Sequence, residues 1–82
     1  YEEAVGYYQQ ALALNPNQPE VLSNLGNAFK EIGKLDEAIA SYQQSIALRP
    51  AYAEAHNNLG IAYKEQQKLE DAIACYQHAI RL

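Results

Sequence analysis

The sequence predicts an all-α protein built as a helical solenoid, and three observations support this prediction. A segment recurs at an interval of thirty-four residues, because 19–48 and 53–82 share sixteen identities in thirty aligned positions. Apolar residues follow helical spacing, and short connections that carry Pro, Gly or polar residues separate the apolar stretches. A recurrence of this length indicates units that each pack on their neighbours along an array.

The 82 residues are enough for one small domain, and the recurrence divides this domain into repeat units. Residues 1–16 match 35–50 at eight of sixteen positions, so the chain begins with the second half of a unit. We therefore expect half a unit in 1–18, a full unit in 19–52 and a nearly full unit in 53–82. If A and B are the first and second helices of a unit, the predicted order is B-A-B-A-B, with antiparallel neighbours.

Proline and glycine mark the predicted helix ends. The first helix runs from Glu2 to about Leu14, before Asn15-Pro16, and the second from Pro19 to about Ile32. The third, fourth and fifth are expected over about 35–48, 53–66 and 69–81. Gly33 suits a left-handed cap after the second helix. After the fourth helix Gln67 stands where glycine is usual, so its side chain must either take the strained left-handed region or use a different cap, and we expect a tighter or altered turn.

Two glycines lie inside predicted helices, where a glycine lowers the stability of the helix by about 1 kcal/mol relative to alanine. Gly26 and Gly60 recur at the same place in their units, as do small residues on the B helices. We expect these small residues to let neighbouring helices approach closely and to make room for aromatic rings, which are Tyr8, Phe29, Tyr42, Tyr63 and Tyr76.

The spacing of these landmarks resembles the tetratricopeptide repeat (TPR) family. The full unit reads Leu22-x2-Leu25-Gly26-x2-Phe29-x8-Ala38-x3-Tyr42-x2-Ser45-x4-Pro50, and the family pattern reads W-x2-L-G-x2-Y, then A-x3-F, then P. The resemblance implies a right-handed superhelical array. It also implies a concave groove, lined by the A helices, in which an extended peptide lies.

One face of each A helix is expected to form this groove, because it lies opposite the apolar stripe. On the second helix these residues are Glu20, Ser23, Asn24, Asn27, Lys30 and Glu31. On the fourth helix they are Glu54, Asn57, Asn58, Ile61, Lys64 and Glu65.

Asparagines on this face can recognise a peptide main chain. Each amide donates and accepts hydrogen bonds, which matches the N–H and C=O groups of an extended backbone whatever its side chains are. Asn24 and Asn58 are thirty-four residues apart, and Asn27 lies one turn beyond Asn24. The pattern looks like the asparagine ladder in the TPR arm of O-linked N-acetylglucosamine transferases and like bacterial TPR repeats. The TPR carboxylate clamp fits less well, because Ser23 stands where its first lysine would be.

Composition excludes several other classes of function. Net charge is −4 with six Lys and Arg residues, which argues against a nucleic-acid partner. No apolar run is long enough to cross a membrane. His56, His78 and the single Cys75 have no partners at catalytic or metal-ligand spacing. We therefore expect no enzyme activity, no metal and no cofactor; the compartment stays open, with the cytoplasm as the favoured expectation.

The expected function is a non-catalytic scaffold that binds a peptide or partner protein. Two alternatives stay open, namely the substrate-recruiting arm of a larger enzyme such as a glycosyltransferase and a self-association module. Self-association would follow from uncapped terminal helices. At the first helix some of Tyr1, Val5, Tyr8 and Leu12 would lack cover, and at the last helix some of Ile73, Cys75, Tyr76 and Ile80.

Overall fold

The computed structural model describes residues 2–82, which form five α-helices; Tyr1 lies outside the described residues. The helices are α1 Glu2–Leu14, α2 Pro19–Glu31, α3 Leu35–Leu48, α4 Ala53–Glu65 and α5 Leu69–Arg81. The sequence predicted all five, and only α2 and α4 end one residue earlier than expected. The all-α class is confirmed.

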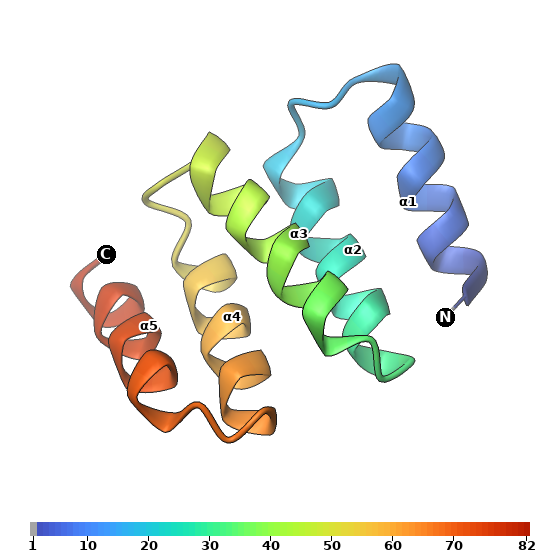
Figure 1. Ribbon diagram of the computed structural model, residues 1–82. Coiled ribbons are helices and arrows are strands. Elements are labelled where there is room, and N and C mark those ends of the chain that lie inside the picture. Colours follow the sequence, from blue (N-terminus) through green and yellow to red (C-terminus); the bar gives the residue numbers. More distant parts are fainter. Residues whose placement is uncertain (1) are drawn as a thin grey trace.

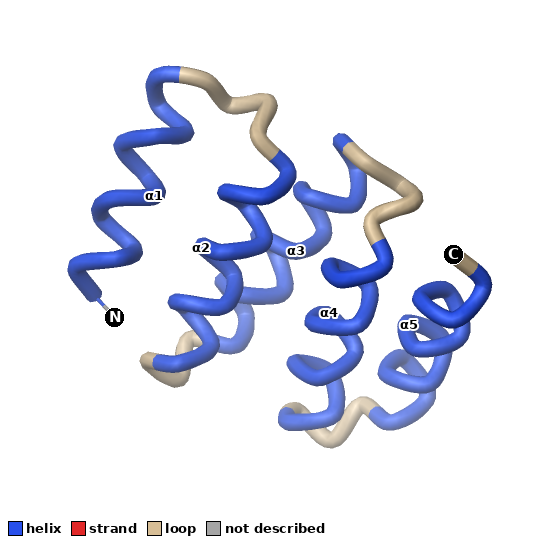
Figure 2. The backbone as a smooth tube through the Cα atoms, turned by 180° about the vertical axis from the view of Figure 1, so that it is seen from behind, coloured by secondary structure: helices blue, strands red, loops and turns tan. Residues whose placement is uncertain are grey.

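Each helix packs on the next one along the chain, and α2 also contacts α4. Figures 1 and 2 show α2 and α4 side by side in one layer, with α3 and α5 in a second layer against them. The Cα atoms extend over 34 × 25 × 13 Å, so the array is two helices thick. This is the α-solenoid that the recurrence predicted.

The core is built around aromatic rings that lie against glycines. Tyr42 on α3 is fully buried, and a Cβ atom added to Gly26 on α2 would lie 2.5 Å from its ring. Tyr76 on α5 lies against Gly60 on α4 in the same way, at 2.8 Å from the added atom. No larger residue fits at either glycine without movement of a ring, so the expected close approach is confirmed.

The turns after α2 and α4 have the same backbone geometry despite their different residues. Gly33 has φ 83° and Gln67 has φ 63°, both in the left-handed region. In both turns the following lysine donates its backbone N–H to a carbonyl five residues earlier, from Lys34 to Phe29 and from Lys68 to Tyr63, at 2.9 Å. This is the Schellman arrangement. The expected change of the turn at Gln67 was wrong; of the two alternatives, the side chain takes the left-handed region, and the cap keeps the bond of Lys68 N–H to Tyr63 O.

Alanine at Gly26 should lower stability, because the new methyl group would displace the buried Tyr42 ring. We expect Gly26→Ala to lower the free energy of unfolding by about 1–2 kcal/mol after the gain in helix propensity is included. Gly6 on α1 is the matched control, since a Cβ atom there meets nothing within 4 Å. Gly6→Ala should raise stability by up to about 1 kcal/mol in urea denaturation followed by circular dichroism. Equal effects of the two substitutions would contradict this packing.

Glycine at Gln67 should raise stability, because an L-residue with φ 63° carries steric strain that glycine lacks. The expected gain is about 1 kcal/mol, and Gly33→Gln should lose a similar amount. Thermal unfolding of the two variants measures both effects. A loss of stability in Gln67→Gly would mean that the side chain of Gln67 stabilises the turn.

Candidate functional site

Most of the residues predicted to form the groove have accessible side chains on α2 and α4. Glu20, Asn24, Glu31, Glu54, Asn57, Lys64 and Glu65 are exposed, and Asn27, Lys30, Asn58 and Ile61 are half-buried. Eleven of the twelve residues can therefore meet a ligand, although accessibility alone does not test the predicted groove.

Ser23 is the exception, and its assignment to the groove was wrong. Its side chain is 0% exposed and lies beside Tyr52, in the segment that leads into α4. α2 and α4 contact each other, and Tyr52 immediately precedes α4. Asn57 is the equivalent residue of the next unit; it is exposed because no described helix follows there. Helical periodicity placed Ser23 on the polar face but could not show that the next A helix covers part of that face.

Asn27 differs from the other asparagines because it also bonds within the core. Its Oδ1 atom accepts a hydrogen bond from the Tyr42 hydroxyl. This bond orients the amide and uses one lone pair of its oxygen, so the Nδ2 donors and the second lone pair of Oδ1 remain for a ligand. The repeat pattern does not predict this bond, since the equivalent pair in the next unit is Ile61 and Tyr76.

A hollow of about 280 Å³ brings three of the predicted residues together with α1. Asn24, Asn27, Glu31 and Ala28 on α2 line it, and Ala4 and Tyr8 on α1 form its other wall. The contribution of α1 was not predicted, because the expected groove used the A helices alone. Tyr8 adds an aromatic surface beside the two amides.

Asn24 and Asn58 occupy equivalent places on neighbouring helices and keep their amides available. Neither side chain makes a hydrogen bond to another residue within 2–82. Asn24 is exposed and Asn58 is half-buried. The pair can therefore offer donors and acceptors to a ligand that crosses from α2 to α4.

Carboxylates give this side of the molecule a negative field. Burial raises the pKa of the Tyr42 hydroxyl far above its ordinary value, and the charges of Glu65 and Glu31 raise it further. Burial also raises the pKa of Tyr52, together with Glu54 and Glu20, while Arg49 acts in the opposite sense. Each tyrosine is thus affected by a different pair of glutamates, and all four glutamates are among the residues predicted to form the groove.

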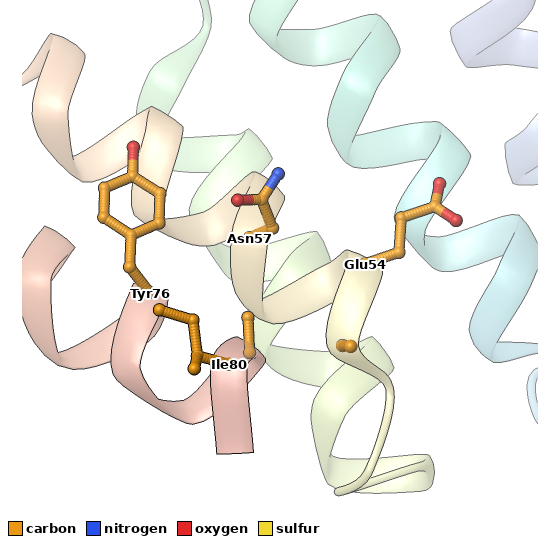
Figure 3. A pocket seen from close by; sticks show the side chains of 6 residues that line it. Glu54, Asn57, Tyr76 and Ile80 are labelled. Atoms are coloured by element: carbon orange, nitrogen blue, oxygen red, sulfur yellow. The ribbon is translucent and has the colours of Figure 1, made fainter. Parts of the chain in front are cut away.

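A second hollow, of about 500 Å³, lies between α4 and α5 at the other end of the array (Figure 3). Glu54, Asn57 and Ala53 line it from α4, and Tyr76, Ala79 and Ile80 line it from α5. Its wall on α5 is apolar. Two of the predicted groove residues therefore belong to a surface different from that of Asn24 and Asn27.

The histidines come together in a way that the sequence did not reveal. The rings of His56 on α4 and His78 on α5 stack with their centroids 5.3 Å apart, and His56 Nε2 lies 2.9 Å from the carbonyl oxygen of Pro50. Their separation in sequence concealed the pairing. Cys75 is buried, and burial raises the pKa of its thiol, which keeps it in the unreactive protonated form. Within 2–82, no three or more His, Cys, Asp or Glu residues are grouped to hold a metal ion.

None of the described helices has the length and apolar character needed to span a bilayer.

Comparison with known families identifies the array. The family described as TPR repeat matches residues 1–33 and 26–67, and the family described as tetratricopeptide repeat matches residues 53–82. The chain therefore belongs to the TPR family, whose repeats are typically non-catalytic protein-interaction modules. A comparison with curated proteins found no match.

Solved structures of TPR domains share this fold closely. The first TPR of Spaghetti (RPAP3) bound to the HSP90 peptide SRMEEVD has a TM-score of 0.96 and 27% identity, over 99% of this chain and 64% of that one. The second TPR of the same protein, bound to the same peptide, has a TM-score of 0.95 and 27% identity, over 100% and 76%. A MamA structure has a TM-score of 0.93 and 29% identity, over 100% and 48%. The chain spans less than half of this and two other MamA chains, at 45% and 42%.

Stability should fall at alkaline pH because the folded state raises the pKa values of Tyr42 and Tyr52 above their ordinary value of 10.0. A tyrosine with a raised pKa stabilises the fold while it is protonated. This contribution is complete below the unfolded pKa and is lost as pH rises toward the folded pKa. Urea denaturation between pH 8 and 11 should show the decline begin at about pH 10. Tyr42→Phe should flatten this decline while lowering stability at every pH; an unchanged slope would contradict the assignment.

Proposed function

We propose that this chain is a peptide-binding scaffold that holds an extended segment of a partner protein across α2 and α4. The observation that carries the proposal is the pair Asn24 and Asn58, whose unbonded amides lie at equivalent places of successive units. Amides at that interval suit an extended main chain, because each can accept from an N–H and donate to a C=O. Asn27 adds two N–H donors in an amide that the bond from Tyr42 orients.

Two neighbours support a peptide as the ligand class. Both TPR domains of Spaghetti (RPAP3) are bound to the HSP90 peptide SRMEEVD, and each is 27% identical to this chain. Their likeness covers nearly all of the five helices described here. An elongated ligand is therefore compatible with this architecture.

Charge argues for a basic or neutral peptide rather than an acidic one. The predicted groove residues include four glutamates, Glu20, Glu31, Glu54 and Glu65, and two lysines, Lys30 and Lys64. A carboxylate-terminated acidic peptide needs compensating cations, and the first lysine of a carboxylate clamp would fall at Ser23, which is buried. We infer that the partner segment carries Lys or Arg facing the glutamates.

A pair of peptides tests both parts of this proposal. The SRMEEVD peptide and its charge-reversed analogue SRMKKVK with an amidated C-terminus can each be titrated by calorimetry. The analogue should bind about tenfold more tightly or better, because it replaces repulsion from the glutamates with attraction. Replacing Asn24 and Asn58 together by Ala should weaken its binding by about tenfold, since each lost hydrogen bond contributes about 0.5–1.5 kcal/mol.

Asn17→Ala is the matched control, because Asn17 is an exposed asparagine in the loop before α2. It should leave affinity and helicity unchanged. Tighter binding of SRMEEVD than of the analogue would contradict only the charge argument. Equal affinity of the Asn24, Asn58 double variant and the parent for the analogue would contradict the amide mechanism.

A further inference from the structure

The histidines of the chain form a pair that the proposed peptide groove does not use. The rings of His56 on α4 and His78 on α5 stack with their centroids 5.3 Å apart and an angle of 27° between the ring planes. His56 is half-buried and His78 is exposed. Two imidazoles from different helices are therefore held together where a small ligand can reach them.

The repeat itself does not require a histidine at either position. The equivalents one unit earlier are Leu22, which is 5% exposed, and Gln44, which is exposed. An apolar side chain fills the A-helix position in that unit, so packing does not explain an imidazole on α4. The carbonyl group that bonds His56 belongs to Pro50, in the segment between α3 and α4. The pair is thus particular to the α4–α5 unit.

A hydrogen bond fixes the position of the proton on the His56 ring. Nε2 lies 2.9 Å from the carbonyl oxygen of Pro50. A carbonyl oxygen can only accept, so Nε2 carries the proton and Nδ1 keeps a lone pair. Metal-ligating histidines are commonly held in this way, by a bond from the other ring N–H to a carbonyl. His78 makes no hydrogen bond to another residue within 2–82, so its ring nitrogens are also available.

The separation of the two rings suits two ligands of one ion. With Zn–N bonds of about 2.0–2.1 Å at tetrahedral angles, the centres of two imidazoles on the same ion lie about 5 Å apart. The observed separation is 5.3 Å. Stacked rings must tilt before their nitrogens converge on an ion. His78 can tilt without movement of a helix, because it is exposed and the χ2 torsion of histidine is broad.

We propose that His56 and His78 bind a divalent transition-metal ion that links α4 to α5. Imidazole nitrogen suits Zn²⁺, Cu²⁺ and Ni²⁺, whereas Mg²⁺ and Ca²⁺ prefer oxygen ligands. Of the residues one turn from His78 on α5, Cys75 is buried and Arg81 is a cation, so neither supplies a further ligand. Water completes the coordination of the ion.

The ion site lies away from the amides of the proposed groove. His56 and Asn58 are two residues apart on α4, which places their side chains about 200° apart around the helix. A bound ion therefore stabilises the α4–α5 pair without contact with a peptide at Asn58. Either proposal can fail without the other.

Titration of the 82-residue chain with ZnCl₂ tests the site, and the chain must be untagged because a histidine tag binds the same ions. Calorimetry should give one Zn²⁺ per chain, and MgCl₂ should give no binding. The NMR signals of both imidazole rings should change with one shared midpoint. At a Zn²⁺ concentration ten times the dissociation constant, the midpoint of thermal unfolding should rise by about 5–10 °C, since only the folded chain brings the rings together. EDTA should reverse the rise.

Two variants locate the ion. His78→Gln should weaken Zn²⁺ binding about tenfold or more, because one of two donors is lost. The matched control combines His78→Gln with Gln77→His, which keeps the composition but turns the imidazole about 100° around α5. It should bind Zn²⁺ as weakly as His78→Gln does. Both positions are exposed, so circular dichroism of each variant should match that of the parent.

Three results would overturn the proposal. The first is affinity for Zn²⁺ no higher than for Mg²⁺. The second is equal Zn²⁺ affinity of the parent and the variant with the moved imidazole, which would place the ion on other surface groups. The third is loss of Zn²⁺ binding in Cys75→Ala, which would assign the ion to the thiol; the proposed site should keep its affinity in that variant.

Discussion

The contact between the Tyr42 ring and the backbone of Gly26 is the constraint on which the array depends. The ring can be fully buried because glycine leaves no Cβ atom in its path. This close approach brings α2 and α3 together, and the repetition of the contact at Gly60 and Tyr76 gives the second unit the same internal geometry. The direction in which α2 and α4 present their polar faces follows from these two contacts.

The two units reach the same geometry with different polar chemistry. In the first, the Tyr42 hydroxyl bonds Asn27, and the Ser45 hydroxyl donates to the Pro19 carbonyl at 2.8 Å. In the second, the equivalents of Asn27 and Ser45 are Ile61 and Ala79, which cannot make these bonds. Shape complementarity between rings and glycines is thus common to both units, whereas the hydrogen bonds are particular to one. The polar faces of α2 and α4 consequently differ in the groups that they can offer to a ligand.

The sequence predicted the helices and the ring-to-glycine packing because both depend on local spacing and on the recurrence of small residues. It failed where the outcome depends on contacts between residues that are distant in sequence or on the bonds of a particular turn. Ser23 has the periodicity of a surface residue, yet the approach of Tyr52 and α4 buries it. Gln67 is a poor left-handed residue by local preference, yet the cap bonds of Lys68 hold it there. His56 and His78 are twenty-two residues apart, and only the antiparallel packing of α4 and α5 brings their rings together.

Among the candidate site residues, helical periodicity identified accessible side chains but not their division between two surfaces. Asn24, Asn27 and Glu31 share a hollow with α1, while Glu54 and Asn57 share another with α5. A helical wheel cannot make this distinction, because it contains no information about the neighbouring B helix.

Among the helices of residues 2–82, α1 and α5 each contact one other helix, whereas α3 contacts α2 and α4, and α2 contacts α1, α3 and α4. Contacts in a linear array are with nearest neighbours, so α1 or α5 can detach while α2, α3 and α4 stay assembled. Fraying of the described helices would then proceed inward from α1 or α5. Loss of α1 or α5 would expose the face of α2 or α4 that it covers, while the central helices stay packed on one another.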